Sequence, residues 1–258
     1  MKKILKEFMV LMACVLIIGC GGTGVSQDEY DKVVAERDKL KEQLDSQQKN
    51  TNSSNKESTK TQNKEFQELT LLNSGWNCTK PYKYSNIYYA VEIKNPNMDY
   101  AIEFPTITVT ARDADGKILS NEERVLNSIA AGDTIIYGSD MSYEGDTPET
   151  VDISVSCNDK NYAKQDNNQY VKQSDFVISN TSENDGRFKK YTGEITNNSS
   201  VDFNTVSISV IYKLNGKMVG GENSFIDNLK AKETKVFEIS ASSDVGEYDS
   251  YEFYAIQW

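Results

Sequence analysis

YYAVEIKNPN at residues 88–97 and KYTGEITNNS at residues 190–199 are two versions of one pattern, and this pattern decides the fold. In both stretches apolar and polar residues alternate up to an asparagine-rich turn. Alternation with a period of two is typical of a half-buried β-strand. The matched pairs are Tyr89 with Tyr191, Glu92 with Glu194, Ile93 with Ile195, and Asn95 with Asn197.

The match continues along the chain at nearly the same offset. ADGKI (114–118) matches LNGKM (214–218), and SIAAGDTIIY (128–137) matches NLKAKETKVF (228–237). The strand-like stretches VDISVSC and YEFYAIQW come last in the two copies. The repeat is about one hundred residues long, the length of one immunoglobulin-like sandwich.

The repeat therefore predicts an all-β fold class. We expect two tandem immunoglobulin-like antiparallel β-sandwiches, at residues 66–160 and 170–258, preceded by a short helical spacer. The polar segment between them, at residues 158–169, is expected to be a linker.

The order of strand, asparagine turn, alternating strand, Gly-Lys turn and final strands resembles the FxLYD domain of bacterial surface lipoproteins. Residues 109–113 keep the aspartate of the motif that names the family, and residues 209–213 keep its tyrosine. The resemblance covers both repeats. It implies an immunoglobulin-like, non-enzymatic surface domain.

The N-terminus predicts an exported and lipidated protein. Lysines precede an uncharged apolar run at residues 8–18, which has the length of a signal peptide and is too short to span a bilayer. Residues 17–20, Ile-Ile-Gly-Cys, resemble the lipobox of bacterial lipoproteins, in which the cysteine thiol is diacylglycerylated and becomes the new N-terminus. We therefore expect a signal peptide at 1–19 and lipidation of Cys20; Cys14 is a weaker rival.

Three segments separate the predicted anchor from the sandwiches. Residues 20–25 form a lipidated, glycine-rich leash. Residues 26–48 have helix-forming composition and heptad-like apolar spacing, which predicts either a single helical spacer or a weak coiled-coil dimer. Residues 49–65 are polar and of low complexity, which is typical of a disordered linker. Together they would hold the sandwiches away from the membrane.

Composition excludes several functions. The net charge of −11 disfavours nucleic acid as a partner. The absence of histidine excludes serine and cysteine nucleophile sites that use a histidine base, and histidine-bearing zinc sites. No spacing of carboxylates singles out a glycosidase pair. We therefore predict no enzymatic activity and no cofactor.

Cys78 and Cys157 lie near the two sequence ends of the first repeat. The first and last strands of such a sandwich are often neighbours, and an extracytoplasmic compartment permits a disulfide. We therefore expect a Cys78–Cys157 bond, with two unpaired thiols as the alternative.

ARDADGKILSNE (111–122) has the outline of a calcium loop, with Asp113, Asp115 and Glu122 at ligand positions. However, Ala111 occupies the first ligand position, and the second repeat has Asn215-Gly216 at the same place. Asp-Gly and Asn-Gly suit tight hairpin turns. We therefore interpret the stretch as a turn and expect no metal.

Aromatic residues are concentrated in the last predicted strand. Tyr251 and Phe253 point to one face, whereas Tyr254, Ile256 and Trp258 point to the other. Both faces can be buried only if a neighbouring domain or a partner covers one of them. The alternative is a ligand platform of Tyr251, Tyr254 and Trp258 that would stack on glycan rings.

These features predict a lipoprotein anchored through Cys20 on the outer side of the cell membrane. The abundance of Lys, Asn, Ile and Tyr favours an AT-rich genome and a Gram-positive envelope. The expected role is non-catalytic binding or scaffolding with an envelope protein or glycan as partner. The alternative is a calcium- or glycan-binding surface adhesin.

Overall fold

The alternating stretches form β-strands throughout the described part of the chain. The structure is a computed structural model and describes residues 66–258 except 166–168, 186–188 and 242–243. These residues belong to one compact unit, Lys64–Trp258. The prediction of an all-β fold class is confirmed for this unit, whose described residues form fifteen strands and one 3-10 turn. The predicted helical spacer lies outside the described residues.

Eight strands lie in the first repeat, and a ninth lies in the segment at residues 158–169 that was expected to be a linker. They are β1 (Thr70–Thr79), β2 (Tyr84–Lys94), β3 (Tyr100–Glu103), β4 (Thr106–Arg112), β5 (Ile118–Val125), β6 (Ser128–Ile129), β7 (Thr134–Glu144), β8 (Thr150–Ser156) and β9 (Tyr162–Lys164). The sheets β1-β2-β7 and β5-β4-β8 face each other across a core, and the short sheet β6-β3-β9 lies beside them. Ile87, Ile93, Ile107 and Ile135 are among the residues buried in this core.

The second repeat contains the 3-10 turn η1 (Gln173–Asp175) and six strands. The strands are β10 (Phe176–Asp185), β11 (Lys189–Asn197), β12 (Phe203–Leu214), β13 (Lys217–Leu229), β14 (Thr234–Ser240) and β15 (Ser250–Gln257). The sheets β10-β11-β14 and β13-β12-β15 enclose a second core. The two repeats therefore have the same order of antiparallel strands in both sheets.

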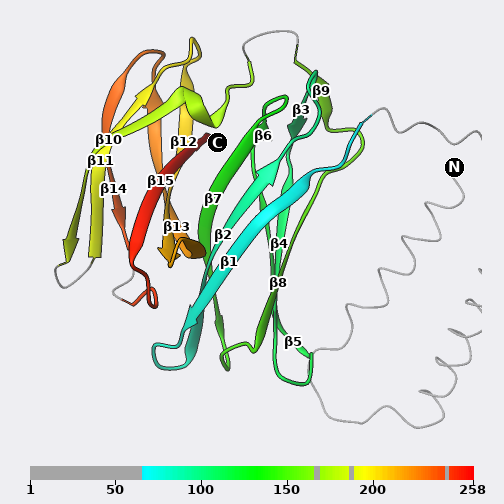
Figure 1. Ribbon diagram of the computed structural model, residues 1–258, viewed down its shortest axis with the longest axis vertical. Coiled ribbons are helices and arrows are strands. Elements are labelled where there is room, and N and C mark those ends of the chain that lie inside the picture. Colours follow the sequence, from blue (N-terminus) through cyan, green and yellow to red (C-terminus); the bar gives the residue numbers. More distant parts are fainter. Residues whose placement is uncertain (1–65, 166–168, 186–188, 242–243) are drawn as a thin grey trace, which may run out of the picture. The chain divides into compact units, whose positions relative to one another are not determined.

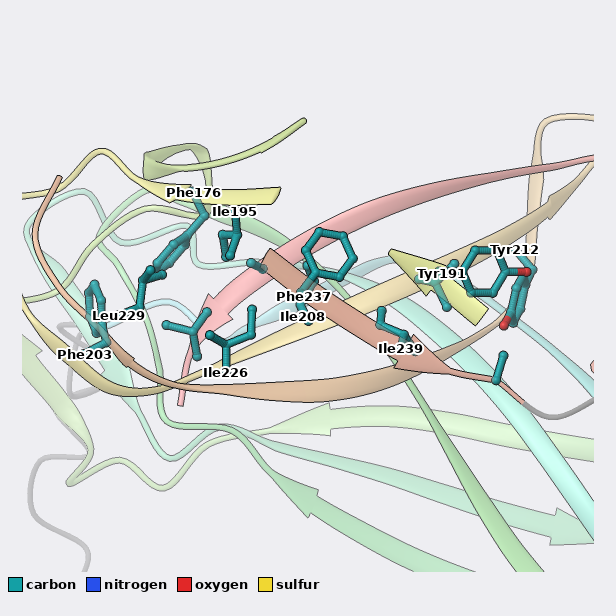
Figure 2. Close-up of a cluster of buried hydrophobic side chains, with 14 of the residues drawn as sticks. Phe176, Tyr191, Ile195, Phe203, Ile208, Tyr212, Ile226, Leu229, Phe237 and Ile239 are labelled. Carbon is teal, nitrogen blue, oxygen red and sulfur yellow. The ribbon is translucent and has the colours of Figure 1, made fainter. Parts of the chain in front are cut away.

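Figure 2 shows how the second core is filled along its length. Phe176, Phe203 and Leu229 gather at one end, and Tyr191 and Tyr212 lie at the other. All five are buried. Tyr212 donates a hydrogen bond of 2.9 Å to the buried carboxylate of Glu222. At this end of the core, the buried hydroxyl of Tyr212 and the buried carboxylate of Glu222 therefore satisfy each other's hydrogen-bonding needs.

The inner sheets of the two sandwiches pack directly on each other. Sheet β1-β2-β7 lies against sheet β13-β12-β15, so that four sheets follow one another (Figure 1). Two glycines make this approach close: a Cβ on Gly221 would lie 2.8 Å from the Cα of Gly138. Ala90, Ile211 and Met218 form a small apolar cluster at this contact.

Hydrogen bonds cross the same contact. Ser209 Oγ donates to the Gly138 carbonyl at 3.0 Å, and Asn77 Nδ2 donates to the Val219 carbonyl at 2.8 Å. A neutral hydrogen bond contributes only about 1 kcal/mol, but its directionality fixes the register of the sheets. The two sandwiches are thus held in one arrangement rather than joined only by a linker.

We predict that Gly221→Ala destabilises the protein by about 1–3 kcal/mol, because the added methyl group overpacks the contact between the inner sheets. Chemical denaturation measures this change in the free energy of unfolding. The control is Ser154→Thr, which adds one methyl group at an exposed position of β8. Equal stability of the two variants would contradict the proposed tightness of the contact.

The matched asparagines of the two repeats have the same structural role. Asn95 is fully buried, and its amide donates to the carbonyls of Tyr100, Ile129 and Ala130 at 2.8, 3.1 and 3.0 Å. Its oxygen accepts the N–H of Asn97 at 3.0 Å. The amide thereby replaces backbone partners where the chain leaves the sheet.

Asn197 repeats this arrangement in the second sandwich. Its amide donates to the carbonyls of Val201 and Lys230 at 2.8 and 3.1 Å, and its oxygen accepts the N–H of Ser199 at 3.0 Å. Each asparagine therefore ties the turn after one strand to the turn before a distant strand. This explains why the same residue begins the turn in both stretches of the repeat.

We predict that Asn95→Ala and Asn197→Ala each lower the free energy of unfolding by about 2–4 kcal/mol, because buried carbonyls lose their donor. Denaturant titration measures the loss. Asn121→Ala, at an exposed position of β5, is the matched control and should change stability by less than about 0.5 kcal/mol. A similar loss in all three variants would show that burial of the amide is not the cause.

Candidate functional site

A groove opens where the edge of β15 meets β7, η1 and β10. We call it the interlayer groove; its volume is about 510 Å³. A second hollow of about 330 Å³ continues it along β15 and shares three of its residues. The residues that carry the argument are Glu92, Asp133, Ile136, Ile178, Phe253 and Tyr254.

The two walls of the groove differ in chemistry. Phe176 and Ile178 of β10 and Phe253 of β15 form an apolar wall that belongs to the second sandwich. Glu92 and Asp133 come from the first sandwich and supply two carboxylates. Neither lysine nor arginine lines the groove or its continuation. The groove is therefore apolar on one side and acidic on the other.

Strand alternation places these side chains. Glu92 has the same parity along β2 as Ala90, which packs against the inner sheet of the second sandwich. Val91 and Ile93 have the opposite parity and lie in the first core. Glu92 must therefore face β15, because successive side chains of a strand point to opposite faces.

The acidic groups have distinct surroundings. Asp133 accepts the N–H of Gln173 at 2.9 Å. Burial raises the pKa of Asp133 above its ordinary value, and the N–H groups of Gln173 and Thr134 oppose this shift. In contrast, hydrogen bonds from Lys213 and Tyr254 lower the pKa of Glu252 at the outer rim.

Gln173 covers the edge of β7 within the groove. Its side-chain oxygen accepts the N–H of Ile136 at 2.9 Å, and its Nε2 donates to the Ile136 carbonyl at 2.8 Å. An amide that exchanges both bonds with one residue imitates a neighbouring strand. The peptide group of Ile136 is therefore already occupied.

The predicted aromatic platform is divided between two surfaces. Tyr251 packs edge-on against the buried Tyr191 in the second core, with ring centroids 4.9 Å apart. Tyr254 packs at the contact between the inner sheets. Trp258 lies beyond the end of β15, stacked on Tyr137 of the first sandwich with centroids 6.3 Å apart. The first sandwich thus covers the second face of the strand, and the three rings do not form one platform.

The expected disulfide is corrected. Cys78 and Cys157 are both free thiols. Cys157 lies beside Glu68 and Leu69, next to the start of β1, whereas Cys78 is near the far end of that strand. Nine residues of strand correspond to roughly 30 Å, and a disulfide needs Cα atoms within about 7 Å. The direction of β1 separates the two cysteines, although they lie near the two sequence ends of the repeat.

The stretch with the outline of a calcium loop lies at the turn between β4 and β5. Asp113 accepts the N–H groups of Asp115 and Lys117 at 3.0 and 2.8 Å, which closes the turn. Glu122 lies on β5 and pairs with Arg124 at 2.8 Å. Among the described residues, no three acidic or cysteine side chains are grouped as metal ligands.

The matching turn of the second repeat joins β12 to β13 by two residues. Asn215 has φ 51° and Gly216 has φ 75°. Positive φ at both central positions defines a type I′ turn, which fits the right-handed twist of the strands. Both repeats therefore use this stretch to reverse the chain.

The N-terminal predictions lie outside the described residues. They comprise the signal peptide, lipidated Cys20, the glycine-rich leash, the helical spacer and the linker. The described part of the chain has no helix with the length and apolar character needed to cross a bilayer.

Sequence reasoning missed the residues that form the groove, above all Glu92, Asp133, Gln173 and Ile178. Glu92 was visible only as the partner of Glu194 in the repeat. The groove exists because one sandwich covers the other, and no local pattern in either repeat encodes that contact. One sequence signal could have indicated this contact between the sandwiches. Glu92 is a polar residue on a strand face that also carries the small residue Ala90.

Comparisons with known proteins leave the function open. No known family profile and no curated protein matches the sequence. Among solved structures, the N-terminal CBM22-1-CBM22-2 tandem domain from Paenibacillus barcinonensis Xyn10C is similar at 9% identity. The match covers 73% of this chain and 85% of that chain, with a TM-score of 0.16. The function must therefore be inferred from the chain's own geometry.

Proposed function

We propose that this chain is a lipoprotein anchored through Cys20 to the outer side of a bacterial cell membrane, in an envelope of the Gram-positive type. Residues 26–65 would hold the sandwiches away from the membrane. Its role is non-catalytic: it binds an envelope partner and serves as a scaffold. The interlayer groove is the observation that carries the binding role, and residues 17–20 support the proposed anchor.

The sandwiches are of the immunoglobulin-like kind. The sheets β1-β2-β7 and β10-β11-β14 correspond to strands A, B and E of that fold. The sheets β5-β4-β8 and β13-β12-β15 correspond to strands C′, C and F. Such folds host many functions, so the site must carry the functional conclusion.

The groove has the chemistry of a binding site. It is concave, it combines aromatic and aliphatic walls with a few polar groups, and it lies at the junction of two sandwiches. The chain contains no histidine that could act as a base for a serine or cysteine nucleophile beside these carboxylates. Binding is therefore the activity that this arrangement supports best.

The membrane anchor is tested with Cys20→Ser. We predict that the full-length protein fractionates with membranes and carries a diacylglyceryl group on its N-terminal cysteine, whereas Cys20→Ser stays unmodified. Mass spectrometry of both proteins measures the modification. Cys14→Ser is the matched control and should leave lipidation intact. Loss of the acyl mass in Cys14→Ser alone would place the anchor at the rival cysteine.

The binding role is tested by filling the groove. Ser174 is an exposed residue of η1 on the groove lining. We predict that Ser174→Trp lowers capture of envelope components by at least about tenfold, because the indole occupies space that a ligand needs. Ser154→Trp on exposed β8 is the control and should bind like the parent protein. Protein and glycan fractions are quantified separately. Equal capture by both variants would exclude the groove as the site.

A further inference from the structure

We propose that the interlayer groove is the empty place of a seventh strand and that it binds an extended, basic peptide segment of a partner protein as an added β-strand. This inference rests on the proposed binding role and names the class of partner. In an immunoglobulin-like sandwich, strand G pairs with the outer edge of strand F. Here β15 has the position of strand F, and no strand among the described residues pairs with its outer edge.

Along that edge, the backbone groups of β15 have no hydrogen-bond partner among the described residues. Trp258 donates its N–H to the Thr205 carbonyl on the β12 side. Because peptide groups alternate in direction along a strand, those of Phe253 and Ala255 point away from β12. They point into the groove, which both residues line. An added strand would supply the partners that these groups require.

The neighbouring edge of β7 does not compete for this role. Gln173 already forms two hydrogen bonds with Ile136 there. Ile178 of β10 lines the opposite wall of the groove. A strand that enters the groove would therefore extend the sheet β13-β12-β15.

The two walls specify the partner's sequence pattern. A strand added beside β15 would turn alternate side chains toward the two sandwiches. On one side they would meet Phe176, Ile178 and Phe253, and on the other Glu92 and Asp133. Apolar residues fit the first wall, and lysine or arginine fits the second. The expected partner segment alternates apolar and basic residues, in the peptide-recognition mode called strand addition.

The probe is an end-blocked octapeptide in which lysine and valine alternate. Eight residues span about 26 Å, comparable to β15. We expect binding to the full-length protein in detergent, measured by calorimetry. Replacing the lysines by glutamates should abolish binding. N-methylation of the amides that face β15 should weaken it by about tenfold or more, whereas N-methylation of the outward amides should not.

Glu92→Gln tests the acidic wall. It removes one charge without a change of shape, and we expect weaker binding of the lysine peptide that becomes equal to the parent's at high salt. Glu123→Gln on exposed β5 is the matched control and should bind like the parent. Thermal denaturation confirms that both variants are folded. Equal affinity of both variants at low salt would overturn the assigned charge pattern.

Amide hydrogen exchange locates the added strand. We expect the lysine–valine peptide to protect the amides of Phe253 and Ala255. Binding without this protection, or insensitive to N-methylation, would overturn strand addition. Protection that rises with protein concentration in the absence of peptide would show pairing of two copies instead, and would also overturn it.

The proposal and the underlying function can fail separately. If Ser174→Trp abolishes capture of envelope glycan while the peptide does not bind, the groove is a glycan site and strand addition is wrong. If Ser174→Trp leaves capture unchanged and the peptide does not bind, the binding role assigned to the groove fails as well.

Discussion

The contact between the inner sheets is the constraint on which the rest of the molecule depends. Gly138 and Gly221 leave no room for a side chain where the sheets meet, and Ser209 fixes their register through the Gly138 carbonyl. Close-packed interiors deform little, so this contact sets how the two sandwiches pack on each other. The two repeats therefore belong to one compact unit. The place of β15 relative to β2 and β7 follows from that contact.

The groove is a consequence of this packing rather than of either sandwich alone. A single sandwich would present the edge of β15 to solvent with one wall, formed by β10. The first sandwich adds the second wall, in which Glu92 and Asp133 line the same groove. Burial then raises the pKa of Asp133. Apolar contact and charge are thus combined at one strand edge, which is what selective recognition of a segment requires.

The sequence predicted those features that are encoded locally. Alternation in residues 88–97 and 190–199 predicted strands, and the matched asparagines proved to be buried amides that tie turns together. The contacts between segments that are far apart in the sequence could not be predicted in this way. The aromatic faces of β15 required a cover, but the sequence could not name the neighbouring sandwich as that cover. The disulfide between Cys78 and Cys157 was wrong because order along the chain does not give the direction of β1.

An open strand edge normally invites pairing between copies of the same protein, and charge is one means of preventing it. β15 faces Glu92 and Asp133 in the groove, and the whole chain has a net charge of −11. Two such edges would repel each other on approach. A basic segment would be attracted to the same groups, so the acidity that keeps the protein from pairing with itself also selects its partner. The same negative charges would then keep the protein soluble and make the groove specific for a basic segment.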